Sequence, residues 1–266
     1  MGFIRGGLLF LIGFVLFTSL IVGNVFFTLA LSITPENIQE QITSNLYDVT
    51  ELVGEEVNLT EEIKENFGLA EEYCVNNSDF VFSQDGYTID VSCDVVEQGP
   101  DALLEKGIKD IVDEFYYKDY SCESFWKCIS NLNDPLFLFS EQTKDYLQNK
   151  FYFSLIVSLV LIGIMFFLVE QKTNLPLIVG SLLIVSSLPF MKLNAFASFF
   201  NDSFLQFLPV LLSKAYFVFL ISFIAGVAVL MLGIGMKFFN LGGFVMEKLE
   251  ERKKSQEMGN KVKKKK

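Results

Sequence analysis

Four long runs of apolar residues, none with a charged side chain, divide the chain of 266 residues. The first covers 7–31, and the others cover 151–169, 175–191 and 215–236. As helices rising about 1.5 Å per residue, all four can cross a hydrocarbon core of roughly 30 Å, 175–191 with little to spare. Because only the sequence EQKTN separates the second run from the third, these two helices should be antiparallel. The pattern predicts four transmembrane α-helices with a more polar domain inserted between the first two.

The polar region 33–150 combines helix and strand patterns, which predict a small α+β domain. Thr34 and Pro35 are typical of a helix start, and apolar residues then recur every three or four positions over 38–57. We interpret this amphipathic helix as a stalk packed on its own domain. A seam for self-association is the alternative. A second short helix is expected near 60–67.

The sequence YCVNNSDFVFSQDGYTIDVSC, residues 73–93, predicts a β-hairpin. Asp85 and Gly86 separate two runs rich in aromatic and β-branched residues, which is a strong local signal for a tight turn. Alternation along the second strand places Cys93 on the same face as Val91, toward the core.

Two further helices are expected before the second span. Gly99 and Pro100 precede a helix with an apolar face made of Leu104, Ile108, Ile111, Val112 and Phe115. Ser140 can cap a helix that begins at Glu141 and continues into the membrane.

A phenylalanine-rich segment, 194–213, precedes the last apolar run. As one helix, 204–236 would measure about 50 Å, well beyond a hydrocarbon core. Pro209 permits a break, so we expect the segment to lie along the outer membrane interface, with Lys214 at the headgroup level and in no need of a partner. The alternative is a re-entrant segment that makes Lys214 a pathway residue.

Small side chains recur within the spans and predict close helix packing. They are Ser19, Gly23, Ser154, Ser158, Gly226, Gly233 and Gly235.

Composition agrees with a membrane protein and excludes several kinds of chemistry. Hydrophobic residues make up 51% of the chain and the mean hydropathy is +0.40, too apolar for an ordinary soluble domain. There is no histidine, which excludes Ser/His and Cys/His catalysis and HExxH zinc sites. No P-loop, GxGxxG, GxSxG or EF-hand loop occurs. We therefore expect no catalytic residue, metal site or cofactor, and no enzymatic activity.

The distribution of charge predicts an orientation. Residues 33–150 contain 26 acidic and 7 basic side chains, a net charge of −19, whereas 237–266 contain 10 basic and 4 acidic ones, a net charge of +6. Arg5 and the basic tail both favour cytoplasmic termini. We expect a multi-pass protein of the cell membrane, with an N-in first helix over 1–32, an acidic domain outside over 33–150, and three helices over 151–236.

Two alternatives concern the ends of the chain. The first span can be read as a cleaved signal peptide, but its length favours an uncleaved anchor. The tail 237–266 can contact anionic lipid headgroups. It contains no folded nucleic-acid-binding domain, so no nucleic-acid partner is expected.

Four cysteines, all in the segment expected outside, predict two disulfides. Of the three pairings, we favour Cys74–Cys93 and Cys122–Cys128, because each closes a short loop. Zinc binding would need CxxC-like spacing or a histidine.

Three Asn-x-Ser/Thr sequons, at Asn58, Asn76 and Asn201, also lie on segments expected outside. They are candidate glycosylation sites.

One span, a large outer domain and three further spans resemble the macrolide-exporter and cell-division permeases associated with ABC ATPases. The resemblance covers the order of spans only and no motif carries it. It implies a transporter or channel subunit. In that alternative, the phenylalanine-rich segment and Lys214 gate a path. The residues favour another function, because the spans lack buried charges. We predict a non-enzymatic membrane protein that presents an acidic outer domain to a protein partner or an envelope layer.

Overall fold

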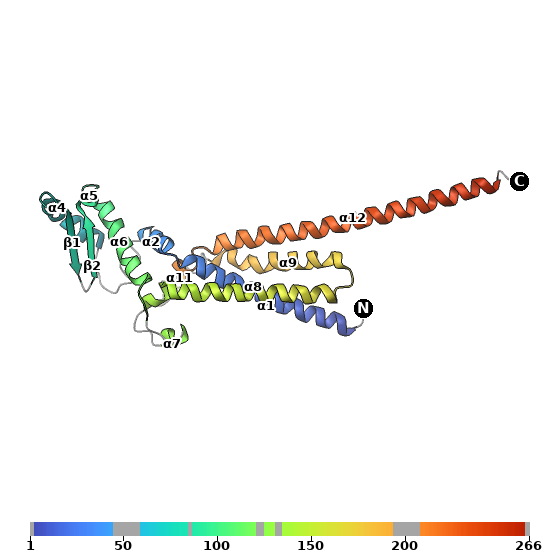
Figure 1. Cartoon of the computed structure of the whole chain (residues 1–266), viewed down its shortest axis with the longest axis horizontal. Coiled ribbons are helices and arrows are strands. Elements are labelled where there is room, and N and C mark those ends of the chain that lie inside the picture. Colours follow the sequence, from blue (N-terminus) through green and yellow to red (C-terminus); the bar gives the residue numbers. More distant parts are fainter. Residues whose placement is uncertain are drawn as a thin grey trace. The chain divides into compact units, whose positions relative to one another are not determined.

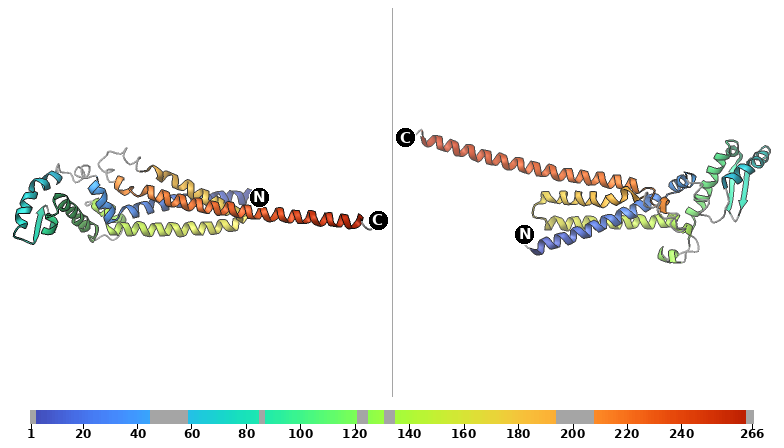
Figure 2. Two further views of the ribbon diagram at one scale, coloured as in Figure 1. Left: turned by 90° about the horizontal axis from the view of Figure 1, so that it is seen from above. Right: turned by 180° about the vertical axis from the view of Figure 1, so that it is seen from behind.

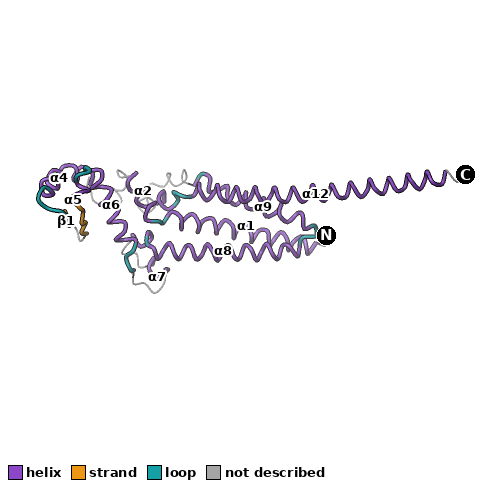
Figure 3. The backbone as a smooth tube through the Cα atoms, turned by 45° about the horizontal axis from the view of Figure 1, so that its top comes forward, coloured by secondary structure: helices purple, strands orange, loops and turns teal. Residues whose placement is uncertain are grey.

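The computed structural model describes residues 3–44, 59–84, 87–120, 125–130, 135–193 and 208–263. These residues are mostly helical and include a two-stranded sheet (Figures 1 and 3). Within them, four helical segments are long and apolar enough to cross a membrane, which indicates a multi-pass membrane protein. These segments are Arg5–Ser32, Glu141–Leu168, Lys172–Met191 and Leu208–Phe239.

Residue contacts divide the chain into two compact units. Unit 1 consists of Met1–Asn24, Phe153–Met191 and Phe217–Lys266, and unit 2 of Val25–Tyr152 and Lys192–Tyr216. The boundaries at residues 24, 152 and 216 fall within or next to long helices rather than in linkers, and each unit has its own buried cluster.

Unit 1 is built from helices that lie alongside one another in all views (Figures 1 and 2). They are the unit 1 portions of α1 (Phe3–Ser32), α8 (Glu141–Leu168) and α12 (Ala215–Lys263), together with α9 (Leu175–Ser187). The 3₁₀ turn η2 (Lys172–Asn174) joins α8 to α9, and the two helices are antiparallel, as the short connection predicts. A second 3₁₀ turn, η3 (Leu188–Met191), follows α9 where Pro189 removes a backbone donor.

Close approaches of helices hold unit 1 together. A Cβ added to Gly180 on α9 would lie 2.7 Å from the backbone nitrogen of Leu230 on α12, and one added to Gly226 would meet Ile184 at 2.8 Å. The predicted role of Gly23, Gly226 and Gly233 in close packing is confirmed, whereas a Cβ at Gly235 would meet nothing within 4 Å. Small residues thus allow backbone contact between α9 and α12.

The helix α12 is longer than the sequence predicts. The apolar run ends at Met236, but the helix continues through the basic tail to Lys263. The tail consists largely of Glu, Lys, Arg, Gln and Met, which favour helices, and it contains no proline. Gly242 and Gly243, six and seven residues beyond Met236, have low helix propensity, but the helix continues through them.

Unit 2 combines short helices with the sheet. It includes portions of α1, α8 and α12. Its other elements are α2 (Pro35–Ser44), α4 (Leu59–Cys74), β1 (Asp79–Gln84), β2 (Tyr87–Ser92), α5 (Cys93–Val96), α6 (Pro100–Tyr116), α7 (Phe125–Ser130), η1 (Pro135–Phe139) and α11 (Leu208–Leu211). Figure 1 shows α6 between the sheet and α2. The fold of unit 2 is organised around this helix.

The apolar face of α6 is buried, as its spacing predicts. Ile108, Val112 and Phe115 belong to a cluster with Ile38 of α2 and Leu147 of α8. A second cluster of Ala70, Val91 and Val96 joins α4, β2 and α5. Both ends of α6 are thereby packed against neighbouring elements.

The predicted antiparallel hairpin is present, and its register runs from Asp79 opposite Ser92 to Gln84 opposite Tyr87. Its turn residues lie outside the described residues. A disulfide joins Cys74 at the end of α4 to Cys93, with 5.4 Å between the Cα atoms. Cys93 is buried, and this is the local pairing that the sequence favours. Closing a loop of this length stabilises a fold by about 3 kcal/mol in the chain-entropy model.

The predicted helix starts are confirmed by their caps. The backbone N–H of Asn37 donates to Thr34 Oγ1 at 3.3 Å, and that of Thr143 donates to Ser140 Oγ at 3.3 Å. The expected apolar stripe over 38–57 lies inside the described residues only up to Ser44.

The second helix was predicted too short, since α4 runs to Cys74 rather than ending near 67. Gly68 does not end it because Ala70 is buried in the cluster beside the sheet, and that packing offsets the low helix propensity of glycine.

A break precedes the last span, as expected, but at another place. Pro209 lies inside α11, and the turn falls at residues 212–214, immediately before α12. Proline is tolerated in the first turn of a helix, so Pro209 starts α11 instead of ending it. Residues 194–207 of the phenylalanine-rich segment lie outside the described residues.

Candidate functional site

The predicted site residues lie at separate places on the chain. Asn76 is exposed just after α4, while Asn58 and Asn201 lie outside the described residues. Cys128 of α7 is buried and disulfide-bonded, and its expected partner, Cys122, lies outside the described residues. Asn76 follows α4 and Cys128 lies on α7, so these two described residues do not form one site.

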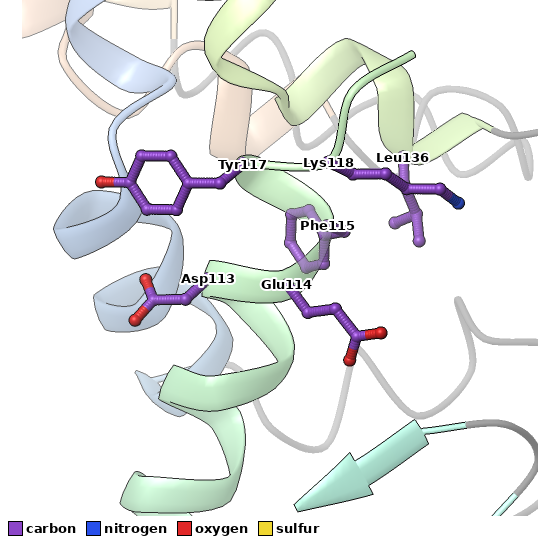
Figure 4. A pocket seen from close by; sticks show the side chains of 6 residues that line it. All are labelled: Asp113, Glu114, Phe115, Tyr117, Lys118 and Leu136. Carbon is purple, nitrogen blue, oxygen red and sulfur yellow. The ribbon is translucent and has the colours of Figure 1, made fainter. Parts of the chain in front are cut away.

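A shallow hollow of about 320 Å³ lies at the end of α6 in unit 2 (Figure 4). Its lining combines apolar surface with three charged side chains. The lining residues are Asp113, Glu114, Phe115, Tyr117, Lys118 and Leu136. Asp113 and Tyr117 point toward α2, whereas Glu114 points to another side of α6.

The hollow forms because α6 stops there. Tyr117 leaves the helical conformation while its N–H still donates to the carbonyl oxygen of Asp113 at 3.1 Å. The chain then turns, and the hydroxyl of Tyr120 donates to the carbonyl oxygen of Phe115 at 3.2 Å. Lys118 Nζ lies 5.3 Å from the centre of the Tyr120 ring. A helix C-terminus carries partial negative charge, to which Asp113 and Glu114 add, so the hollow suits a cationic group with an apolar stem.

Tyr116, next to the hollow, is buried, and its hydroxyl has no hydrogen-bond partner among the described residues. Burial raises the pKa of Tyr116 above the ordinary value of 10.0, and Glu141, Tyr117, Asp145 and Glu36 raise this pKa further. The phenol therefore stays protonated at physiological pH, which makes it unsuited to act as a general base.

Lys214 has a partner, contrary to the sequence-based expectation. Its Nζ lies 3.7 Å from Glu40 Oε2 of α2, and its backbone N–H donates to Ser32 Oγ at 3.3 Å. Asn37 Nδ2 donates to the carbonyl oxygen of Ser32 at 2.7 Å and to Ser213 Oγ at 2.8 Å. The sequence did not indicate this pair, which forms because α2 follows α1 so closely that Glu40 lies beside the start of α12. Lys214 thus belongs to a polar contact between chain segments.

Polar side chains in unit 1 bond mainly between helices or at their ends. The hydroxyls of Ser19 and Ser158 lie 3.0 Å apart, and Ser222 Oγ donates to Asn24 Oδ1 at 2.9 Å. Arg5 Nε donates to the carbonyl oxygen of Leu168 at 2.7 Å, and Arg5 Nη1 lies 3.4 Å from Glu170 Oε1. Such bonds can hold helices together in a bilayer.

Within the part of the chain that the structure describes, no group of three or more His, Cys, Asp or Glu side chains is placed to hold a metal ion. The site with the most distinctive chemistry there is the acidic hollow.

Asp113 and Glu114 are two of the 26 acidic side chains of 33–150, among which no pair is diagnostic. The sequence pattern does not single out Tyr117, Lys118 or Leu136 either. The hollow needs η1 beside the end of α6, which no local pattern specifies. The sequence DEFYYKD, with two acids before consecutive aromatic residues, was the only local signal.

Comparisons with protein-family models, with curated proteins and with solved structures found no significant match.

Proposed function

We propose that the chain is a non-enzymatic integral membrane protein that presents the acidic region 33–150 outside the cell and binds a partner with a basic surface. The observation that carries the proposal is the hollow at the end of α6, where Asp113 and Glu114 lie on a scaffold with buried apolar contacts. Charge complementarity steers such encounters and suppresses wrong partners.

One structural observation supports the outward orientation, because disulfides such as Cys74–Cys93 persist in oxidising compartments. The contact of Arg5 with Glu170 brings the start of α1 and the α8–α9 connection together, as two crossings between them require whichever side they face. The disulfide and the basic tail together favour cytoplasmic termini and an acidic domain outside.

The orientation is tested by labelling intact cells with a maleimide that cannot cross membranes. A cysteine introduced by Glu105→Cys, at an exposed position of α6, should be labelled in intact cells. A cysteine introduced by Ser255→Cys in the basic tail should be labelled only after lysis. The opposite pattern would invert the proposed topology.

Partner binding is tested with a photoreactive amino acid in place of Leu136, which lines the hollow. We expect an adduct of defined mass in intact cells, which disappears in the double variant Asp113→Lys/Glu114→Lys. The matched control reverses two exposed acids of α4, Glu71→Lys/Glu72→Lys, and should keep the adduct. If no adduct forms and the purified protein mediates specific solute flux in liposomes, the transporter or channel alternative replaces this proposal.

A further inference from the structure

We propose that Trp126 anchors unit 2 to the membrane by inserting its indole into the lipid headgroup layer. Trp126 is the only tryptophan of the chain, lies on the short helix α7, and is 69% exposed. The proposal depends on α8 crossing the membrane. It does not depend on which side unit 2 faces, or on partner binding.

The position of α7 along α8 supports this assignment. The ring of Phe125 stacks on that of Tyr146, with centroids 4.1 Å apart and 9° between the planes. A second contact joins Phe125 to Phe137 of η1, with centroids 5.8 Å apart. Figures 1 and 2 show α7 beside the first turns of α8 rather than over its end. These ring contacts attach α7 to the beginning of α8.

The level of Tyr146 follows from helix geometry. The apolar run of α8 begins at Phe151, after Lys150. Five residues correspond to about 7 Å along a helix, and each polar layer of a bilayer is roughly 5–8 Å thick. Tyr146, and Phe125 stacked on it, should therefore lie in the headgroup layer. The Trp126 ring, with its centroid 5.7 Å from that of Phe125, lies near the same level.

The chemistry of the surrounding side chains suits this layer. Indole has a large apolar surface and one N–H donor, and tryptophan and tyrosine are enriched at membrane interfaces. Tyr152 on α8 is 51% exposed, and Lys150 Nζ lies 5.1 Å from the centre of the Tyr146 ring. Trp126 thus lies beside exposed residues of α8, a helix that itself enters the lipid. This position favours lipid, rather than a protein, as the surroundings of the Trp126 ring.

The test uses the full-length protein in phosphatidylcholine liposomes, because its single tryptophan reports the environment without any substitution. We expect emission shifted to shorter wavelengths than in water. Lipids brominated near the headgroup should reduce the emission more than lipids brominated near the chain ends, and aqueous iodide should reduce it little. Emission at the wavelength of tryptophan in water, reduced by iodide and unaffected by brominated lipids, would overturn the proposal. Strongest quenching by bromines at the chain ends would overturn the headgroup placement.

Two variants sharpen the result. In Trp126→Phe/Tyr73→Trp the only indole lies on α4, which packs against α5, α6 and β1. Iodide should quench this indole, and brominated lipids should not. In Phe125→Ala the stack on Tyr146 is lost, and quenching by the shallow brominated lipid should fall while quenching by iodide rises. An unchanged quenching pattern in Phe125→Ala would show that this stack does not position Trp126.

Discussion

Each unit has a buried apolar cluster, but exposed apolar side chains are much more frequent among the described residues of unit 1 than among those of unit 2. In unit 2, residues such as Ile108 and Val112 are 6% and 0% exposed and form the core around α6. In unit 1, residues such as Leu159 and Ile224 are 59% and 63% exposed, and the closest contacts involve glycine and serine. Unit 2 thus has the packing of a protein in water, and unit 1 that of helices in lipid.

The difference shows that similar residue types stabilise the two units through different forces. Burying an apolar side chain removes it from water, a favourable change of about 25 cal/mol per Å². Helices already in lipid gain little in this way, and they associate through close packing and interhelical hydrogen bonds. Substitutions of the same chemical kind should therefore have different effects in the two units.

The largest expected effect is that of Ile108→Ala on unit 2. Ile108 lies in the cluster that joins α6 to α2 and α8, so its truncation leaves a cavity and should lower the free energy of unfolding by about 2–5 kcal/mol. The matched substitution Leu159→Ala on α8 removes a side chain that is exposed in unit 1 and should change stability little. Denaturant titration in micelles, followed by the emission of Trp126, measures the first effect, and circular dichroism measures the second. Equal losses in the two variants would contradict the comparison.

Gly180→Ala should have the next largest effect, this time in unit 1. The added methyl group would meet the backbone of Leu230 at 2.7 Å and the carbonyl oxygen of Gly226 at 2.9 Å. Neither backbone group can yield without separating α9 from α12, and overpacking of this kind costs about 1–3 kcal/mol. The control Gly163→Ala adds the same methyl group on α8, where nothing lies within 4 Å. Thermal unfolding in lipid nanodiscs should distinguish the two, and equal midpoints would show that α9 and α12 are not closely packed.

Local features were the ones that the sequence predicted correctly. The four spans, the caps at Thr34 and Ser140 and the β-hairpin depend on residues close together in the chain. The Lys214–Glu40 pair and the contact of Gly180 with Gly226 were missed, because they join segments far apart in sequence. The extension of α12 to Lys263 was missed for another reason, since its charges were interpreted as an orientation signal and as contacts to anionic lipids, not as part of a helix.

The candidate site was harder to predict than the fold. Asp113 and Glu114 are ordinary acidic residues on an amphipathic helix until η1 and Leu136 close one side of the hollow. Trp126 was also overlooked, although it is the only tryptophan of the chain and tryptophan is enriched at membrane interfaces.

A smaller effect is expected at high pH in unit 2. Because the pKa of Tyr116 is raised in the folded state, the unfolded chain loses the phenol proton at a lower pH than the folded protein does, near the ordinary pKa of 10.0. Tyr116 therefore does not alter the pH dependence of stability below about pH 10, and it lowers the free energy of unfolding as the pH rises further. Tyr116→Phe should remove this alkaline loss and slightly stabilise the protein at neutral pH, because no buried hydroxyl is left unpaired. The exposed Tyr117→Phe serves as the control. Identical alkaline profiles for the wild type and Tyr116→Phe would contradict the assignment.

The smallest expected effect is that of Lys214→Met, which tests whether this residue serves packing or transport. Lys214 pairs with Glu40 at 3.7 Å, and both side chains are substantially solvent-exposed, so the ion pair should contribute no more than about 1 kcal/mol. The hydrogen bond from its backbone N–H to Ser32 does not depend on the side chain and should survive. We therefore expect a small drop in the unfolding midpoint, and an equal drop in Glu40→Gln, because either change removes the same pair. If Lys214→Met instead abolishes a solute flux that Glu40→Gln leaves intact, Lys214 acts on a transport pathway. That result would support the transporter alternative.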